Sequence, residues 1–313
     1  MTNRYFVTGA AGFIGSNLVE AIIANGDKVI GLDNFSTGKP GNIEPFLDKM
    51  EFVEGDIRDL KLCKKLCNKA DYVLHQAALG SVPRSVDDPI TSNDNNINGT
   101  LNMLVAARDA NVKRFVYAAS SSAYGDTPTL PKIETMQSNP LSPYAVTKYV
   151  SELYAAVFTR VYDLPTIGLR YFNVFGKRQD PDGAYAAVIP KFVKAIIAND
   201  PPNILGDGEQ TRDFTFIENV IQANLKACTA KEEAFGQVMN IGAGGRISLN
   251  DLTNKMLVLL NSSLKPTYGP VRAGDVRDSQ ADIEKAKKLI SYNPTVDALT
   301  GLEKAIDWYR NNL

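Results

Sequence analysis

Tyr144 and Lys148, four positions apart, are the residues of this sequence best suited to proton chemistry. Side chains at this spacing share one face of a helix. A phenol with a pKa of about 10 is a poor base at neutral pH, and a nearby ammonium lowers that pKa. A shift to about 7 needs roughly 4 kcal/mol, which the lysine and a second cation could share. The pair predicts a general base, although an exposed helix face would carry the same pattern.

The elements around this pair alternate between strand and helix. Ser142 is suited to an N-cap and Pro143 to the first helical position, so a helix is expected to start there. A long helix is expected over residues 90–110. Predicted strands cover residues 4–8, 28–32, 51–54, 71–74, 114–118 and 166–169. This order predicts an α/β fold with a doubly wound, parallel, Rossmann-type sheet that binds ligands at the carboxyl ends of its strands.

The sequence divides into two predicted lobes. Residues 1–172 are expected to form a dinucleotide-binding Rossmann domain, and residues 214–229 are expected to return to it as a strand and a helix. Loops rich in Gly, Pro and Asp follow the sixth predicted strand. Residues 173–313 are therefore expected to form a smaller α/β lobe for the substrate.

A glycine-rich turn follows the first predicted strand. Gly9, Gly12 and Gly15 let the backbone turn tightly and let a phosphate approach the free N–H groups of the next helix. Asp33 ends the second strand, 18 residues beyond Gly15. A carboxylate at that point accepts both ribose hydroxyls of an adenosine, which favours NAD over NADP. Lys39 is the first basic residue that follows this acid.

The composition excludes several classes of partner. The chain has 313 residues, 44% of them hydrophobic, and a formal net charge of -1. No basic excess points to nucleic acid or to an anionic membrane, and we expect neither as a partner. We also expect no signal peptide and no membrane span. Three cysteines are a sparse, odd set that suits a reducing, cytoplasmic location, and with one histidine they argue against a zinc site.

Taken together, these motifs resemble those of a known family. Residues 8–15, Asp33, the serines at 120–122 and Tyr144-x-x-x-Lys148 resemble the extended short-chain dehydrogenase/reductase superfamily. Residues 169–176 and 206–214 are similar to its nucleotide-sugar branch, and within it to UDP-N-acetylglucosamine and UDP-glucose 4-epimerases. The resemblance covers essentially the whole chain.

The resemblance implies an NAD site and a UDP-sugar site. The residues implied for NAD are Gly9, Gly12, Phe13, Ile14, Gly15, Asp33, Asn34, Ser36, Thr37, Gly38, Asp56, Ile57, Gln76, Ala77, Ala78, Asn96, Tyr144, Lys148 and Phe172. Those implied for the UDP-sugar are Ser81, Ser120, Ser121, Tyr144, Asn173, Val188, Lys191, Asn203, Leu205, Arg212, Arg272, Asp275 and Ser279. It also implies a homodimer formed through residues 90–110 and 144–162.

The implied reaction combines hydride transfer with a general base. The phenolate of Tyr144 takes the proton of the sugar 4-hydroxyl while hydride passes from sugar C4 to the nicotinamide. The transient 4-keto sugar then turns and receives the hydride on its other face. One serine orients the 4-hydroxyl: Ser121 is favoured, with Ser120 and Ser122 left open.

Two stretches discriminate among sugars within the resemblance. Dehydratases and decarboxylases of this superfamily carry an acid after the serines, whereas this chain has Ala123 followed by Tyr124. Simple epimerisation is therefore favoured. Relatives restricted to glucose and galactose carry a tyrosine where Ser279 stands, and the smaller serine leaves room for an N-acetyl group. Residues 80–85, Ser81 among them, also resemble epimerases that prefer N-acetylated sugars.

The favoured interpretation is a 4-epimerase that interconverts UDP-N-acetylglucosamine and UDP-N-acetylgalactosamine, with UDP-glucose and UDP-galactose as a further pair. The first alternative is a 4-epimerase or decarboxylase of UDP-glucuronate or an N-acetylated uronate, which needs a basic residue such as Arg84 or Arg178 at the sugar carboxylate. A remote alternative is a non-catalytic NAD-binding regulator, against which the intact Tyr144 and Lys148 argue.

Overall fold

The computed structural model describes residues 2–182, 187–271 and 276–312. Within these ranges, seven parallel strands form the largest sheet, in the order β11-β6-β5-β4-β1-β2-β3. The strands are β1 (Arg4–Thr8), β2 (Lys28–Asp33), β3 (Glu51–Glu54), β4 (Tyr72–His75), β5 (Arg114–Ser120), β6 (Thr166–Tyr171) and β11 (Gln237–Ile241). The strand order reverses between β1 and β4, which is where a doubly wound sheet opens a crevice for ligands. The predicted fold class is confirmed.

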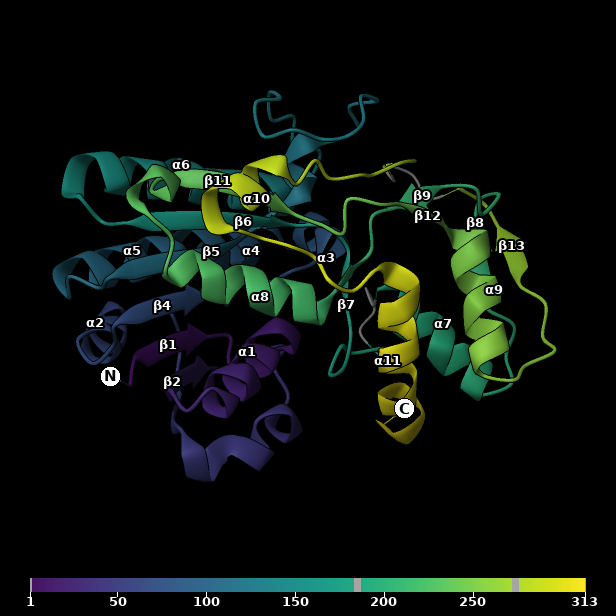
Figure 1. The fold of residues 1–313 in the computed structure, drawn as a ribbon, viewed down its shortest axis with the longest axis horizontal. Coiled ribbons are helices and arrows are strands. Elements are labelled where there is room, and N and C mark those ends of the chain that lie inside the picture. The colour runs from purple at the N-terminus through teal and green to yellow at the C-terminus, as the bar shows by residue number, and fades with distance from the viewer. Residues whose placement is uncertain (1, 183–186, 272–275, 313) are drawn as a thin grey trace.

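Helices cover both faces of this sheet (Figure 1). One face carries α1 (Phe13–Ala24), α8 (Ile217–Cys228) and α10 (Glu284–Ile290), and the other carries α2 (Leu60–Cys67), α5 (Gly99–Asp109) and α6 (Pro143–Tyr162). Each face has its own apolar cluster. Leu18, Val220 and Ile290 belong to the first cluster, and Met103 and Phe158 to the second. Since both faces are buried, the strands read as nearly continuous apolar runs.

The remaining elements gather beyond the carboxyl edge of the sheet, on the right of Figure 1. Three helices, α7 (Val188–Ile197), α9 (Leu249–Leu259) and α11 (Ala298–Asn312), pack on one another. Short strand pairs join them: β7 (Val174–Phe175) with β10 (Thr215–Phe216), β8 (Asn203–Leu205) with β13 (Thr267–Gly269), and β9 (Thr211–Arg212) with β12 (Ile247–Ser248). This region is held by short pairs and loops rather than by one sheet.

Short elements complete the described chain. They are η1 (Pro40–Asn42), η2 (Glu44–Lys49), α3 (Val82–Asp87), α4 (Pro89–Asn93), η3 (Asp94–Asn98), η4 (Ser121–Tyr124) and η5 (Glu232–Ala234). Across the described ranges, no helix is both long enough and apolar enough to cross a membrane.

Two features differ from the expectations. The helix expected over residues 90–110 is α4, a π-helical turn (η3) and α5 in succession, because one extra residue is accommodated within the helix. Strand β11 was not located from the sequence, since its five residues include the polar Gln237 and Asn240 and are too short for a clear periodicity. It pairs with β6, within the range assigned to the substrate lobe. Helix α8 packs on β5 and β6, and the two-lobe division stays a prediction.

Candidate active site

Tyr144 lies at the start of α6, whose first turn is fixed by local contacts. The Ser142 side chain accepts a hydrogen bond from the Ala145 N–H, and Pro143 occupies the first turn, as predicted. The Tyr144 N–H donates to Ser85 Oγ over 3.0 Å. This bond ties the helix start to the segment that follows β4. One turn along α6, Lys148 Nζ lies 5.9 Å from the centre of the Tyr144 ring and donates to the Ala118 carbonyl over 2.9 Å.

The pKa of Tyr144 is raised in the protein, contrary to the expected lowering. Burial raises this pKa, and a hydrogen bond with the Ser120 side chain opposes the rise. Burial also lowers the pKa of Lys148 to about 8, against the influence of the Glu152 carboxylate. The reason for the difference is desolvation, which disfavours the charged form of both groups.

Among the three serines, Ser120 is the one in contact with Tyr144. Its side chain ends β5, and its Oγ accepts hydrogen bonds from the Ser122 N–H and the Ser122 hydroxyl. Ser121 is half-buried and begins the η4 turn beyond it. The geometry therefore favours Ser120 over Ser121, which the sequence analysis had preferred, as the serine that orients a hydroxyl at Tyr144.

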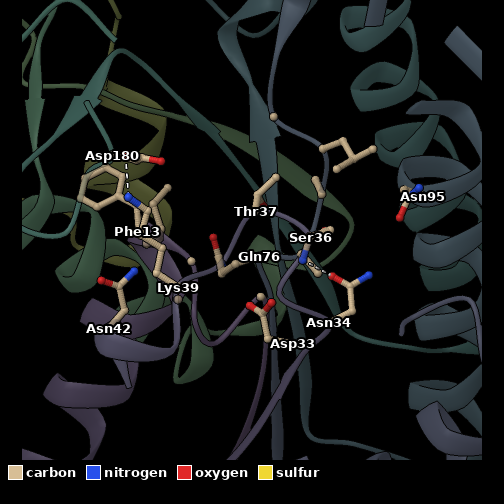
Figure 2. A pocket seen from close by; sticks show the side chains of 18 of the residues that line it. Phe13, Asp33, Asn34, Ser36, Thr37, Lys39, Asn42, Gln76, Asn95 and Asp180 are labelled. Carbon is tan, nitrogen blue, oxygen red and sulfur yellow. Dashed lines mark hydrogen bonds and ion pairs between the residues drawn. The ribbon is translucent and has the colours of Figure 1, made fainter. Parts of the chain in front are cut away.

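A cavity of about 410 Å³ opens at the carboxyl ends of β1, β2 and β4, within the range of small-molecule sites (Figure 2). Most residues predicted for NAD line it. They are Gly9, Gly12, Phe13, Ile14, Gly15, Asp33, Asn34, Ser36, Thr37, Ile57, Gln76, Ala77 and Ala78, joined by Ser81 from the predicted sugar site. The cavity thus collects residues from four separate stretches of the chain.

The glycine turn fits a bound pyrophosphate. A Cβ on Gly15 would lie 1.9 Å from the Gly9 carbonyl oxygen, and Gly9 itself has a φ of +68°. Gly12 caps α1, and in the described structure no side chain accepts the first N–H groups of this helix. Free N–H groups at a helix N-terminus, reached over a backbone without side chains, are suited to phosphate.

Asp33 lies at the end of β2 and is held by backbone donors. Its carboxylate accepts from the Ala11 N–H over 2.9 Å and from the Phe35 N–H over 2.8 Å. Burial raises its pKa, and these hydrogen bonds oppose the rise. A Cβ on Gly38 would lie 2.7 Å from an Asp33 oxygen, so glycine is needed there for the loop to pass this acid. The carboxylate faces the cavity on the side of Asn34 and Ser36 (Figure 2).

Six residues predicted for NAD do not line the described cavity: Tyr144 and Lys148, described above, and four others. Gly38 packs on Asp33 as described. Asp56 accepts from Arg58 and from Asn34, and the Arg58 hydrogen bond lowers its pKa to about 2. Asn96 is buried, and its side chain bonds the Leu79 backbone.

Phe172, the fourth, is fully buried against Tyr124, with the ring centres 6.2 Å apart. It therefore belongs to the apolar core. Cofactor contact by these four residues stays a prediction.

Several lining residues were not predicted for NAD. They are Leu32, Lys39, Asn42, Gly55, Leu79, Gly80, Arg84, Asn95, Arg178, Gln179, Asp180 and Ala187. Lys39 Nζ lies 2.7 Å from Asp180 Oδ1, so the loop after β2 meets the loop after β7 across the cavity from Asn95 (Figure 2). No local sequence motif predicts the contact between Lys39 and Asp180, because the two residues are far apart in sequence.

Part of the predicted sugar site comes together among the elements beyond the carboxyl edge of the sheet, which we call the second region. Asn173 Nδ2 donates to Ser279 Oγ over 3.2 Å. The Ser279 N–H donates to the Thr211 carbonyl over 3.1 Å, and Arg212 donates to the Arg277 carbonyl over 2.6 Å. Asn173, Arg212 and Ser279 are therefore linked through their neighbours.

The other predicted sugar residues fall on separate elements. Val188 and Lys191 lie in the first turns of α7, and Asn203 and Leu205 lie on β8. Arg272 and Asp275 lie outside the described residues. The structure therefore links three of the predicted residues and leaves the contacts of the others as predictions.

Asp213 is a functional candidate that sequence reasoning missed. Its carboxylate is fully buried and accepts hydrogen bonds from the N–H groups of Ala243, Gly244 and Ala281. Its own carbonyl accepts from Asn173. Burial raises its pKa to about 6, and the three backbone donors oppose this. One carboxylate thus joins the end of β9 to the segments that carry Ala243 and Ala281, and its place after an arginine in the sequence does not predict these contacts.

The comparisons with known proteins now bear on the site. A model of the NAD dependent epimerase/dehydratase family matches residues 5–242. The chain belongs to this family. A putative UDP-glucose 4-epimerase of Methanocaldococcus jannaschii is 41% identical over 98% of this chain and 98% of its own.

Two solved structures are similar over nearly their whole length. A UDP-N-acetylglucosamine 4-epimerase from Methanobrevibacter ruminantium, in complex with UDP-N-acetylmuramic acid, has a TM-score of 0.95 and 38% identity, and the match covers 100% of this chain and 99% of that one. A UDP-glucuronic acid 4-epimerase from Bacillus cereus, with UDP-glucuronic acid and NAD, has a TM-score of 0.91 and 33% identity over 99% and 100%. Members of the family with these names confirm the predicted family, its NAD dependence and the expectation of an isomerase.

Proposed function

We propose that this protein is an NAD-dependent 4-epimerase that interconverts UDP-N-acetylglucosamine and UDP-N-acetylgalactosamine, with UDP-glucose and UDP-galactose as slower substrates. The proposal rests on one observation. Tyr144, Lys148 and Ser120 lie close together beside the segment after β4 that forms part of the cavity wall. The Tyr144 N–H bonds Ser85, four residues beyond Ser81 of the cavity wall. A base beside a dinucleotide-sized cavity is the minimum that this reaction needs.

The residues of this chain have distinct tasks in the proposal. Bound NAD supplies the hydride acceptor and donor. Tyr144 takes and returns the proton of the sugar 4-hydroxyl, and Ser120 orients that hydroxyl through its hydrogen bond with the phenol. Lys148, buried and one turn away, favours the phenolate when it is charged. Gly9, Gly15 and the N-terminus of α1 hold the pyrophosphate, and Asp33 holds the adenosine ribose.

Ser279 supports the N-acetylated sugar. It is half-buried and hydrogen-bonded to Asn173, within the group of residues proposed to hold the UDP-sugar. A serine there occupies little volume, so an acetamido group at sugar C2 finds room that a larger ring would fill. The M. ruminantium relative, named for UDP-N-acetylglucosamine, agrees with this choice.

The absence of a carboxylate at residue 123 supports epimerisation over elimination or decarboxylation. Ala123 is fully buried in the η4 turn, directly after the serines. A dehydration needs a further acid–base residue at the sugar, and alanine supplies no proton. The simplest reaction for this site therefore returns the hydrogen to the carbon that lost it.

A second candidate is the 4-epimerisation of UDP-glucuronate. Arg84 and Arg178 line the cavity, and a guanidinium binds a carboxylate through two parallel hydrogen bonds. The B. cereus relative is named for this substrate. Release of carbon dioxide would instead indicate a decarboxylase. A relative from Bacillus cytotoxicus is named as a UDP-N-acetyl-alpha-D-glucosaminuronate decarboxylase.

The test is to incubate the purified protein with each UDP-sugar and to separate the products. We expect UDP-N-acetylglucosamine to give its galacto epimer at the highest kcat/KM, and the Tyr144→Phe variant to bind NAD without turnover. Epimerisation of UDP-glucuronate alone would select the second candidate. NAD binding without any product would select the non-catalytic alternative.

A cytoplasmic homodimer completes the proposal. The outer face of α6 exposes Val146, Leu153, Val157 and Val161, and Ile90 of the adjoining α4 is 80% exposed. An apolar face on a pair of helices is covered most economically by the same face of a second copy. Analytical ultracentrifugation should give twice the chain mass for the protein and the single mass for a Val157→Glu/Val161→Glu variant.

A further inference from the structure

A buried ion pair lies behind the proposed base. Glu152 of α6 and Arg170 of β6 are each 5% exposed. Arg170 Nε lies 2.9 Å from Glu152 Oε1 and Arg170 Nη2 lies 2.7 Å from Oε2, so the carboxylate is held at both oxygens. The guanidinium also stacks on the Tyr124 ring, 4.6 Å from its centre. Such a pair loses hydration on burial and often contributes less stability than apolar side chains of equal volume.

The position of the pair gives it a second role. Tyr144, Lys148 and Glu152 follow one another at intervals of four residues, so they share one face of α6. Lys148 is 7% exposed, and its ammonium donates to the Ala118 carbonyl. Burial favours the neutral amine, whereas a carboxylate one turn away favours the ammonium. These two influences oppose each other at Lys148: burial lowers its pKa to about 8 and Glu152 resists that fall.

The other charged and titratable groups around this face come from several elements. They are His75 of β4, Tyr117 of β5, Tyr124 of η4, Glu134, Arg170 of β6 and Lys285 of α10, which the charges of Arg170 and Glu152 influence. Among them, Glu134 bonds the Asn240 backbone and acts on Tyr124 and Lys285. Within the described residues, Glu152 is thus the carboxylate that acts on Lys148.

We propose that Glu152, fixed by Arg170, is a positioning residue that keeps Lys148 charged beside Tyr144. This inference rests on the proposed function of Tyr144 as the base. A neutral amine at Lys148 would no longer favour the phenolate of Tyr144. The general base would then be lost, although Tyr144, Lys148 and Ser120 were all still in place. The buried pair therefore extends the catalytic machinery by one more turn of α6.

The test compares two substitutions that break the same pair in opposite electrostatic senses. Glu152→Gln leaves the cation of Arg170 near Lys148, and Arg170→Met leaves the anion of Glu152. We expect the alkaline limb of the kcat/KM profile to move to lower pH by about one unit or more in Glu152→Gln. In Arg170→Met the limb should stay or move to higher pH. Limbs that coincide in the two variants would show a purely structural pair and would overturn the inference.

A direct titration separates this inference from the proposed function. The side-chain NMR signal of Lys148 in lysine-labelled protein, assigned by its loss in Lys148→Met, should titrate at lower pH in Glu152→Gln than in the unaltered protein. This measurement needs no substrate. A shifted titration in a protein that epimerises no UDP-sugar would sustain the inference about Lys148 and remove the function. Epimerisation with an unshifted Lys148 would do the reverse.

A third variant covers the case in which a single substitution prevents folding. Glu152→Leu/Arg170→Met replaces the pair by apolar side chains, which buried sites commonly tolerate. It too removes the carboxylate beside Lys148. We expect a folded protein whose Lys148 titrates at lower pH than in the unaltered chain. An unchanged titration in this variant would overturn the inference.

Discussion

The carboxyl edge of the sheet and the second region are built in different ways. At the sheet edge, Asp33 and Ser120 end strands and Tyr144 begins a helix, so regular elements fix their positions. In the second region, loops carry Asn173 and Ser279, and Asp213 joins them: its carbonyl accepts from Asn173, and its buried carboxylate accepts from Ala281. This difference indicates that the reaction and the choice of sugar can be altered separately by substitution. In the proposed function, the chemistry belongs to the sheet edge, and the choice of sugar belongs to a region whose loops tolerate change.

The largest effect is expected at the sheet edge, from Tyr144→Phe. Removing the phenolic oxygen removes the general base, so kcat should fall by about 10²- to 10⁴-fold with NAD still bound. Tyr149→Phe, on the same helix, is the matched control and should keep its activity. Steady-state kinetics of both variants make the test. Full activity in Tyr144→Phe would mean that the base lies elsewhere.

Substitution in the second region should change the sugar rather than the chemistry. In Ser279→Tyr, a ring fills the room proposed for the acetamido group. The kcat/KM for UDP-N-acetylglucosamine should therefore fall by about 10- to 200-fold. The value for UDP-glucose should change little. Ser279→Ala loses the bond to Asn173 but keeps the room, so it serves as the control. Equal losses for both sugars in Ser279→Tyr would break the separation drawn above.

The buried carboxylate of the second region predicts a pH dependence of stability. The pKa of Asp213 is raised to about 6 in the folded protein, so the folded state binds this proton more tightly than the unfolded state. The resulting stabilisation is full below the unfolded pKa of about 4 and is lost as pH rises through about 6. The loss is of the order of 2–3 kcal/mol.

Asp213→Asn tests this dependence, because its side chain stays neutral at every pH. Urea unfolding from pH 4 to 7 should show the free energy of unfolding of the unaltered protein falling relative to that of the variant as pH rises. Parallel curves for the two proteins would mean that the pKa of Asp213 is the same in the folded and unfolded states. The second region would then contain no buried carboxylate that makes stability depend on pH.

The smallest effect is expected where the two regions meet, at Lys39 and Asp180. Both side chains are about half exposed, and such ion pairs contribute up to about 1 kcal/mol. Lys39→Met should therefore release NAD no more than roughly five-fold faster, with kcat unchanged. Added salt should bring the unaltered protein toward the variant. Lys49→Met, a nearby exposed lysine, is the control, and a slower release in Lys39→Met would refute the bridging role.

The same contrast explains what the sequence could reveal. The glycine turn, Asp33 and the Tyr144 helix are local patterns with a local physical cause, and the fold follows from their alternation. About half of the cavity lining was predicted, part of it from these patterns and the rest from the family resemblance. Asn42, Asn95 and Asp180 reach the cavity only through tertiary packing, so no spacing in the sequence marks them.

Other residues show the same limit. The sequence favoured Ser121 among the three serines, whereas Ser120, at the end of β5, is the one hydrogen-bonded to Tyr144. The expected lowering of the Tyr144 pKa is not found, because burial, which sequence spacing does not report, raises it and the hydrogen bond with Ser120 only opposes the rise. Asp213 and Glu152 take their importance from partners far along the chain, Ala281 and Arg170.

The central claim is that Tyr144 serves a reaction in which sugar C4 loses a hydrogen and regains it on the opposite face. The most direct test is to incubate the protein with UDP-N-acetylglucosamine deuterated at C4 and to examine the product by NMR and mass spectrometry. The account predicts the galacto epimer with its deuterium retained at C4. An unchanged gluco sugar, or a galacto epimer that carries hydrogen from the solvent at C4, would contradict it.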